Sequence, residues 1–222
     1  DLGGGTFDVS VLDVSGSVYE VVATRGNNRL GGDDFDALLV QHVCTSFYLE
    51  HNIDLREDRM ALQKVLDACE QAKKELSEAE STLISVPFIS ADEDGPKHLE
   101  LSVSRSEFEN LLREHLETIS ALVDGALEDA ALDPEEIDAV VPAGGSTRIP
   151  AGLALLEEKF PGRVTRTANP DECVAAGAAV QAGIMDGGVK DLVLVDVTPL
   201  TLGIRAENDA FVPIIERNSC IP

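Results

Sequence analysis

Apolar and polar residues change their spacing several times along the chain, and each change predicts an element. Thr6 to Leu12 and Val18 to Thr24 alternate the two kinds of residue, which predicts strands joined by a turn at Ser15-Gly16. A helix is expected to start at Gly31-Gly32-Asp33-Asp34, because the apolar residues after it recur at helical spacing. These residues are Phe35, Leu38, Leu39, Val43 and Phe47.

The next part of the chain predicts a helix followed by a pair of strands. The helix runs from about Leu55 to Leu76, with Asp54 as its cap and Glu57 as the partner of the cap. Strand-like segments follow at Thr82 to Ile89 and Leu99 to Val103, on either side of a turn-rich segment.

A long amphipathic helix is predicted after these strands, because Ser104 and Glu107 form a capping box ahead of an apolar stripe. The stripe consists of Phe108, Leu111, Leu112, Leu116, Ile119, Val123 and Leu127. A short apolar strand from Asp138 to Ala143 then leads through a Gly-Gly pair into another helix. An Ala-rich helix, whose small residues permit close packing, is expected from Asp171 to about Ile184.

Strands that alternate with helices predict an α/β fold. Two helices and a strand pair, over about residues 32–115, predict a subdomain inserted into that fold. The tail has a different character, because Asp191 to Val197 is a short apolar stretch and two strand-like segments follow it with no helix between them. This change predicts a linker and the start of another domain.

The net charge of the chain restricts the classes of molecule that it is expected to bind. The 222 residues include 41 acidic and 17 basic side chains, which gives a formal net charge of −24. Because Lys and Arg supply most of the affinity for nucleic acid, this balance argues against a nucleic-acid partner. No apolar run approaches the roughly 18 residues of a membrane span. No signal segment precedes Asp1, so a cytoplasmic protein without a membrane contact is expected.

A glycine loop at the start of the chain is the first candidate for chemistry. It reads Asp1-Leu2-Gly3-Gly4-Gly5-Thr6-Phe7-Asp8. Three consecutive glycines let a backbone approach phosphate oxygens closely and offer them N–H groups. Thr6 adds a hydroxyl, and the carboxylates of Asp1 and Asp8 can hold Mg²⁺ directly or through water. A flexible hairpin turn is the alternative, but the two carboxylates and the threonine favour a phosphate and metal loop.

A second glycine pair ends the predicted strand before residue 144. Gly144 and Gly145 would place free N–H groups and the positive end of a helix beside a bound anion. Arg148 can lay its planar guanidinium along an aromatic base. An ordinary connection in which Ser146 or Thr147 caps the helix explains the segment equally well.

Two further groups of polar residues have structural explanations of their own. Glu70, Lys73, Lys74 and Ser77 share one face of the second predicted helix, opposite its apolar stripe. On its own this pattern favours a solvated face, and a polar wall that binds a ribose is the functional alternative. Asp171 follows Asn169-Pro170, and either polar residue can cap the Ala-rich helix.

Six motifs, taken in their order along the chain, resemble those of a known family. They are DLGGGTFDVSVL, LGGDDFD, ACEQAKKELS, AGGSTRIP, NPDECVAAGAAVQAGI and DLVLVDVTPLTLGI. Together they cover nearly the whole chain, and it resembles the seventy-kilodalton heat-shock chaperones, of which DnaK is the bacterial type. The resemblance implies the C-terminal lobe of an actin-like, ribonuclease H-like ATPase domain over residues 1–185, with the subdomain at 32–115 inserted in it. It implies an interdomain linker at 186–197 and the start of a substrate-binding β-domain at 198–222.

The resemblance also implies roles for individual residues. Gly3, Gly4, Gly5 and Thr6 would meet the β- and γ-phosphates of ATP or ADP, with Asp1 and Asp8 around Mg²⁺ and its waters. Glu70, Lys73 and Ser77 would contact the adenosine, and Gly144 and Gly145 would contact the ribose and the α-phosphate. Arg148 would cover one face of the adenine, with Asp171 nearby, and Lys74 and Ser146 would also belong to the nucleotide-binding set. Asp1, Thr6 and Asp8 would carry the catalytic roles.

Departures from the family pattern accompany these matches. Lys74 stands where several members carry an Arg that stacks on adenine, Ala143 stands where a larger aliphatic residue is common, and Ala206 to Pro213 lacks the usual paired glycines. The family's first lobe has its own phosphate loop, a catalytic Lys and a Glu that positions water, and nothing of it precedes Asp1. The chain is therefore expected to be a fragment that is inactive alone.

The expected function is that of an ATP-dependent chaperone in which ATP hydrolysis drives the capture and release of unfolded or extended client peptides. The resemblance implies a J-domain co-chaperone and a nucleotide exchange factor as further partners. One alternative is a non-hydrolysing module that binds nucleotide or a co-chaperone. A second is a sugar kinase of the actin-like superfamily, against which the apolar linker and the β-only tail argue.

Overall fold

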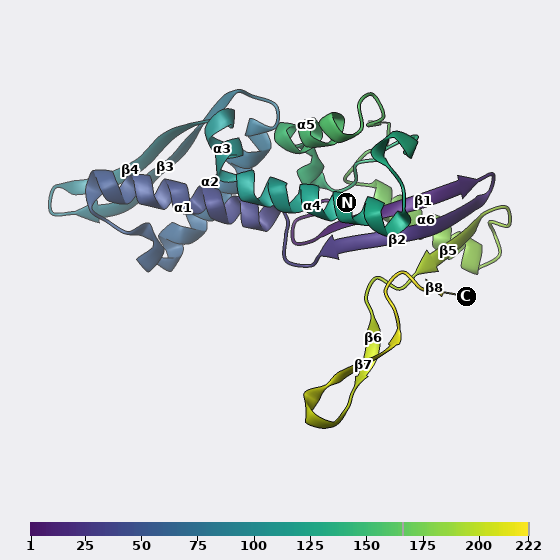
Figure 1. The fold of residues 1–222 in the computed structure, drawn as a ribbon. Coiled ribbons are helices and arrows are strands. Elements are labelled where there is room, and N and C mark those ends of the chain that lie inside the picture. Colours follow the sequence, from purple (N-terminus) through teal and green to yellow (C-terminus); the bar gives the residue numbers. More distant parts are fainter. Residues whose placement is uncertain (166, 222) are drawn as a thin grey trace.

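The structure, a computed structural model that describes residues 1–165 and 167–221, combines a mixed sheet, helices and an extended C-terminal hairpin (Figure 1). The sheet and the helices beside it are β1 (Phe7–Ser15), β2 (Val18–Asn27), α4 (Arg113–Ala130), α5 (Pro150–Lys159), α6 (Cys173–Met185), β5 (Val193–Val197) and β8 (Cys220–Ile221). The segment 32–111, which the sequence predicts to be an inserted subdomain, contains α1 (Gly32–His51), α2 (Arg59–Leu76), β3 (Ser81–Asp92), β4 (Gly95–Ser104) and α3 (Arg105–Leu111). The C-terminal hairpin contains β6 (Leu202–Arg205) and β7 (Phe211–Ile215).

The opening hairpin that the alternating pattern predicts is confirmed. β1 and β2 pair antiparallel from Phe7 opposite Asn27 to Ser15 opposite Val18, and Gly16 takes a left-handed φ of 62° in the turn. One face of the hairpin carries its buried side chains, and α4 covers it. These side chains are Phe7, Val11, Val21 and Ala23.

The apolar stretch near residue 195 extends this sheet. β5 pairs parallel with β2, with Val193 opposite Val18, and β8 then pairs antiparallel with β5, so that the strand order is β1-β2-β5-β8. The part of the chain that is expected to be a linker therefore contributes a strand to the sheet of residues far from it in sequence.

The inserted subdomain has the predicted elements with two corrections. The stripe of α1 is buried at Phe35, Leu39, Val43 and Phe47. The predicted single helix from Leu55 is wrong, because a 3₁₀ turn at Leu55–Glu57 precedes α2.

The second correction concerns the cap of α2. The Asp58 carboxylate accepts hydrogen bonds from the N–H groups of Met60 and Ala61 at 2.8 and 3.3 Å, which makes Asp58 the N-cap. Asp54 instead caps the 3₁₀ turn through the N–H of Arg56.

The strand predicted from Asp138 to Ala143 is absent from the described structure, which has only a parallel bridge between Val140 and Val164 at this point. The N–H of Val140 donates to the carbonyl of Arg163, and the carbonyl of Val140 accepts from the N–H of Thr165. The next N–H on the same side would belong to Pro142, which has none, so the ladder cannot continue.

The long helix is divided, although its capping box is confirmed. Ser104 accepts from the N–H of Glu107, whose carboxylate accepts from the N–H of Ser104 at 2.8 Å. Leu112 then separates α3 from α4, and its side chain is fully buried. The apolar stripe therefore continues across the break.

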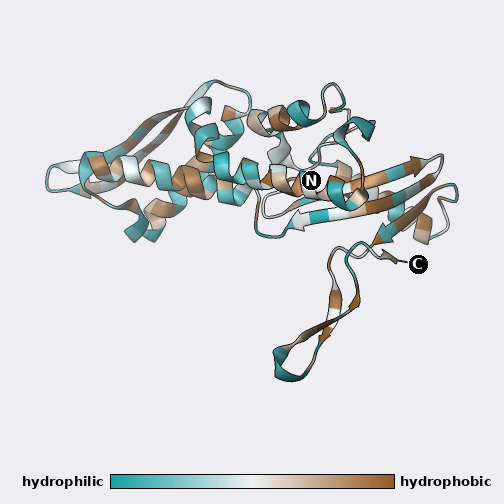
Figure 2. Ribbon diagram, viewed as in Figure 1, coloured by the Kyte–Doolittle hydropathy of each residue, from teal (hydrophilic) through white to brown (hydrophobic). Residues whose placement is uncertain are grey.

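Apolar surface remains uncovered on α6 and on the C-terminal hairpin. The side chains of Val174, Val180 and Met185 are exposed on α6, so the close packing expected from its small residues is absent from the described structure. Figure 2 shows hydrophobic residues along β6 and β7 and a hydrophilic tip between them. No helix in the described ranges has both the length and the apolar character needed to cross a bilayer.

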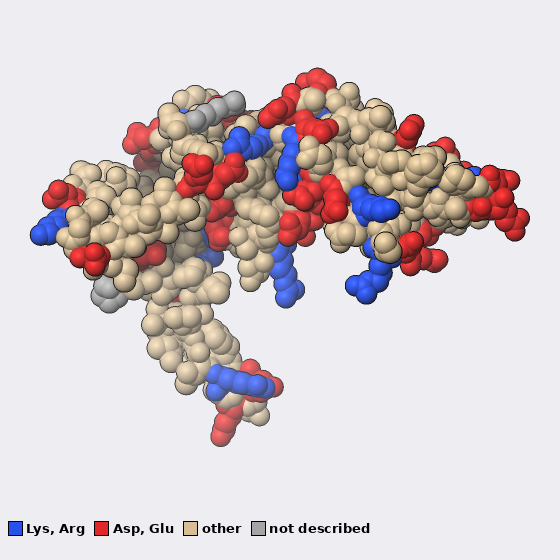
Figure 3. Space-filling model, turned by 180° about the vertical axis from the view of Figure 1, so that it is seen from behind, with Lys and Arg blue, Asp and Glu red and all other residues tan. Residues whose placement is uncertain are grey.

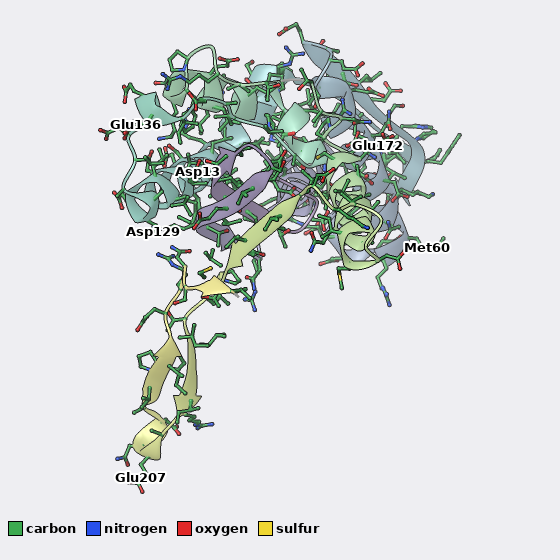
Figure 4. All side chains as sticks on the ribbon, turned by 90° about the vertical axis from the view of Figure 1, so that its right-hand side faces the viewer. Asp13, Met60, Asp129, Glu136, Glu172 and Glu207 are labelled. Carbon is green, nitrogen blue, oxygen red and sulfur yellow. The ribbon has the colours of Figure 1, made fainter. Side chains whose placement is uncertain are left out.

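One carboxylate joins the C-terminal hairpin to the rest of the fold. Asp129 of α4 accepts two hydrogen bonds of 2.8 Å from Arg25 of β2 and one of 2.6 Å from Arg217. Asn218 donates to the same carboxylate, and its side-chain oxygen accepts from the N–H of Thr24 at 3.1 Å. Figure 4 shows Asp129 where the hairpin leaves the body and Glu207 at the far end of the hairpin.

We expect Asp129→Asn to lower the free energy of unfolding by about 2 kcal/mol at neutral pH, because two guanidinium groups lose a charged acceptor. The hydrogen bond from Arg25 lowers the pKa of Asp129 below its ordinary value. Its stabilisation is therefore present at neutral pH and is lost as the pH falls through the lowered pKa. Urea unfolding at pH 7 and pH 3 should show a smaller pH effect in the variant, and an equal effect would contradict this role.

Candidate functional site

The opening glycine loop lies against the start of α1 through two backbone hydrogen bonds. The N–H of Gly32 donates to the carbonyl of Gly3 at 2.9 Å, and the N–H of Asp33 donates to the carbonyl of Gly4 at 2.7 Å. Gly31 makes this approach possible, because a Cβ there would lie 2.5 Å from the carbonyl carbon of Gly4 and 2.7 Å from the nitrogen of Gly5.

The same two bonds orient the N–H groups of the loop. In a trans peptide the N–H points opposite to the C=O, so the N–H groups of Gly4 and Gly5 face away from α1. These groups and the N–H of Thr6 find no hydrogen-bond acceptor among the described residues. Gly4, Gly5 and Thr6 are exposed. Successive exposed N–H groups of this kind make a concave site for an anion.

The two carboxylates of the loop occupy neighbouring positions. Leu2 and Phe7 form an antiparallel bridge, and the N–H of Asp8 donates to the carbonyl of Asp1 at 2.8 Å. Asp1 and Asp8 are thus directly opposite one another, which puts their side chains on the same side of the strand pair. Gly144 and Gly26 flank them, and a Cβ on either glycine would collide with the adjacent carboxylate.

This arrangement fits Mg²⁺. The ion is usually held by one or two carboxylates together with waters and the phosphates of a ligand, rather than by a protein cage. Asp1 and Asp8 supply two such carboxylates beside a loop of exposed N–H groups. Within the described ranges no group of three or more His, Cys, Asp and Glu side chains could hold a metal ion by itself.

The second glycine segment contacts the first through backbone and hydroxyl groups. The N–H of Ser146 donates to the carbonyl of Leu2 at 3.1 Å, and the Ser146 hydroxyl donates to the carbonyl of Gly3 at 3.0 Å. Gly144 has a φ of 85°, and a Cβ there would lie 2.5 Å from the Asp1 carboxylate. Residues 144–148 therefore need glycine at Gly144 to come this close to the loop. They form a short 3₁₀ turn, Gly145–Arg148, that precedes α5.

A cavity of about 650 Å³ lies where these segments meet α2. Its volume is in the range of ordinary ligand sites. Eight of the residues that the sequence singles out line it, namely Gly4, Lys73, Lys74, Ser77, Gly145, Ser146, Arg148 and Asp171. The other candidates, Asp1, Gly3, Gly5, Thr6, Asp8, Glu70 and Gly144, are not among its lining residues.

Part of the lining was not predicted from the sequence. Its unexpected apolar members are Pro142, Ile149, Leu153, Ala168 and Pro170. They come from three separate parts of the chain, so no single motif marks them. The N–H of Gly144 donates to the carbonyl of Pro170 at 2.8 Å, which brings two of these parts together. The resulting wall suits the flat apolar face of an aromatic ligand.

Arg148 is held at the edge of the cavity by polar partners. Its guanidinium donates to the Asp171 carboxylate at 2.5 Å and to the Asn169 side-chain oxygen at 3.3 Å. These bonds lie in the guanidinium plane, which leaves the faces of the group available for stacking. Both Arg148 and Asp171 are about half exposed, so the pair contributes orientation more than stability.

The polar wall of α2 divides into an exposed pair and a buried pair. Lys74 donates to Glu70 at 2.6 Å on the exposed surface, and this bond lowers the pKa of Glu70. Lys73 instead turns inward and donates to Asp36 of α1 at 2.7 Å and to the carbonyl of Gly32 at 3.1 Å. The Ser77 hydroxyl donates to the carbonyl of Lys73 at 3.3 Å. The structure thus brings Lys73 and the start of α1 together, a contact that the sequence did not indicate.

The surrounding surface is acidic, whereas the cavity is lined by three cationic residues, Lys73, Lys74 and Arg148, and by two acidic ones, Glu78 and Asp171. Figure 3 shows acidic side chains spread over the surface with basic side chains among them. Backbone N–H groups, Lys73, Lys74 and Arg148 converge on the cavity and the adjacent loop. A local field of this kind attracts an anion even where the net charge is negative.

Comparison with protein families gives one match that extends over the chain. A family model described as Hsp70 protein matches residues 1–222. The match includes the glycine loop, the inserted subdomain, the second glycine segment and the C-terminal hairpin.

We expect Gly31→Ala to displace the glycine loop, because the added Cβ would meet backbone atoms that cannot rotate away. The N–H groups of Gly32 and Asp33, which donate to the loop, should exchange with solvent about tenfold faster. Amide hydrogen exchange followed by mass spectrometry measures this directly. Gly152→Ala is the control, because its Cβ would meet nothing within 4 Å, and unchanged protection in Gly31→Ala would contradict the assigned contact.

Proposed function

The chain belongs to the Hsp70 family, and on this basis we propose that its cavity and glycine loop bind ATP or ADP together with Mg²⁺. The observation that carries the proposal is the meeting of two unlike surfaces. An apolar cavity wall beside Arg148 adjoins a loop in which the N–H groups of Gly4, Gly5 and Thr6 have no acceptor among the described residues. An adenine nucleotide has the same two parts, a flat base and a polyphosphate.

The adenosine part of the proposal rests on the cavity. Pro142, Ile149 and Leu153 offer apolar contact to a base, and Arg148 offers a guanidinium face that Asp171 keeps in place. Lys73 and Ser77 line the side formed by α2 and offer polar groups to a ribose. Lys74 lies beside them, with its ammonium group engaged by Glu70.

The phosphate part rests on the glycine loop. The outward N–H groups of Gly4, Gly5 and Thr6 would donate to phosphate oxygens. Asp1 and Asp8 would hold Mg²⁺ through its waters, and the bound ion neutralises charge on the phosphates. For hydrolysis, the hydroxyl of Thr6 and the carboxylates of Asp1 and Asp8 are the groups that we propose would orient a water beside the terminal phosphate.

We further propose an ATP-dependent chaperone role, in which nucleotide state controls the binding of client peptides. The supporting observation is that β5 pairs with β2 of the main sheet while Arg217 and Asn218 contact Asp129. A change at the glycine loop, which leads directly into β1, has a continuous route through the sheet to the C-terminal hairpin. A J-domain co-chaperone and an exchange factor that acts on residues 32–115 are the proposed partners.

Calorimetric titration with Mg-ADP tests the binding proposal. Arg148→Ala should weaken binding about tenfold, because a stacked guanidinium contributes roughly 1–2 kcal/mol to binding a ring. Arg56→Ala is the matched control, because it also removes an Arg–Asp pair but one remote from the cavity lining. Equal affinities in the wild type and Arg148→Ala would contradict the assigned role of Arg148.

ATP turnover tests the catalytic part separately. We expect Asp8→Asn to lower Mg²⁺-dependent turnover at least about tenfold, because a metal-associated carboxylate loses its charge. Turnover should be measured in this chain and in a protein extended upstream of Asp1. Nucleotide binding with no turnover in either protein would favour a non-hydrolysing module over an ATPase.

A further inference from the structure

We propose that Asp36 is a positioning residue for the bound nucleotide, which acts by holding the Lys73 ammonium group at the wall of the cavity. The inference rests on the proposed nucleotide site and adds a residue that does not line the cavity. According to this proposal, residues in the first turns of α1 hold the side chain of Lys73, which belongs to α2, in the position where it contacts the ligand.

The pair lies in the interior between α1 and α2. Asp36 and Lys73 are only 12% and 13% exposed in their side chains, and Asp36 Oδ2 lies 2.7 Å from Lys73 Nζ. The carbonyl of Gly32 accepts a second hydrogen bond from Lys73 Nζ at 3.1 Å. An ammonium group has three donors, so these two acceptors leave one N–H for a ligand in the cavity that Lys73 lines.

The same contacts connect Lys73 with both glycine segments. Gly32, whose carbonyl accepts from Lys73, donates its own N–H to the carbonyl of Gly3. The hydroxyl of Ser146 donates to that same carbonyl. A Cβ at Gly32 would lie 2.6 Å from Ser146 Oγ and 3.0 Å from Lys73 Nζ. The ammonium group is therefore fixed relative to the loop that is proposed to hold the phosphates.

Burying the carboxylate of Asp36 between α1 and α2 costs free energy. Asp36 Oδ1 is buried and has no hydrogen-bond partner among the described residues. Burial raises the pKa of Asp36 above its ordinary value, and the charges of Glu70 and Asp33 act in the same direction. The hydrogen bond from Lys73 opposes this rise. Because buried ion pairs often stabilise a fold no better than apolar side chains do, packing alone does not account for this residue.

Lys74 provides an internal comparison. Its partner Glu70 is one turn away on the same helix, and both side chains are more than half exposed. A pair of this kind restrains its lysine weakly. Asp36 instead reaches Lys73 from another helix and restrains it where solvent is largely excluded. Of the two neighbouring lysines, only Lys73 is held by buried acceptors.

A double-mutant cycle on Mg-ADP affinity tests the proposal. Asp36→Asn keeps the shape of the side chain and removes its charge, and it should weaken binding about tenfold while Lys73 is present. In a Lys73→Met background the same change should weaken binding less than about twofold, because the group through which Asp36 acts is gone. Asp92→Asn is the control, because it breaks a Lys–Asp pair of the same subdomain at the turn of β3 and β4.

Chemical labelling of the lysines separates this inference from the proposed function. In Asp36→Asn, Lys73 should react with an amine-directed acylating reagent at least about fivefold faster relative to Lys74, because it has lost its buried partner. This result supports the restraint of Lys73 by Asp36 whether or not the wild type binds Mg-ADP, whereas a wild type that fails to bind Mg-ADP would overturn the nucleotide site for which Lys73 is positioned. An unchanged ratio of labelling rates would overturn the role of Asp36. An equal loss of affinity in both backgrounds of the cycle would overturn it as well.

Discussion

A backbone contact without side chains organises the candidate site. The glycine loop can lie against α1 only because Gly31 carries no Cβ where the peptide of Gly4 and Gly5 passes. This contact satisfies the first N–H groups of α1 with loop carbonyls, and in doing so it turns the N–H groups of the loop outward. The outward direction of these N–H groups, on which the proposed binding of phosphate rests, is thus a consequence of how the helix start is capped. The helix and the loop cannot be considered separately.

Charge is distributed on two scales in this protein. Over the whole chain the acidic side chains outnumber the basic ones, with a net charge of −24. Within the site a few donors are held close together, and the buried Asp36 keeps one of them, Lys73, in place. Local fields fall off with distance and with screening, whereas the net charge governs solubility and long-range association. An acidic protein and a site for a polyphosphate are therefore compatible.

Carboxylates on α1 and α4 connect parts of the fold that the sequence pattern treats as separate. Asp36 joins the first two helices of the inserted subdomain through Lys73, which lines the cavity, and Asp129 joins α4, β2 and the segment after β7. Together with the pairing of β5 to β2, the Asp129 contacts bring the C-terminal segments onto the main sheet. The apolar surfaces of α6 and of β6 and β7 remain exposed in the described structure.

Local spacing was enough to predict the opening hairpin, the capping box at Ser104 and the stripe of α1, because each depends on neighbours a few positions away. The sequence alone did not reveal the bridge at Val140, the parallel pairing of β5, or the apolar wall from Pro142 to Pro170. Each of these joins segments that are distant in sequence. The same holds for the pairing of Lys73 with Asp36, since the pattern of α2 favours a solvated face. Only the tertiary packing of α1 against α2 supplies a buried partner and turns that lysine inward.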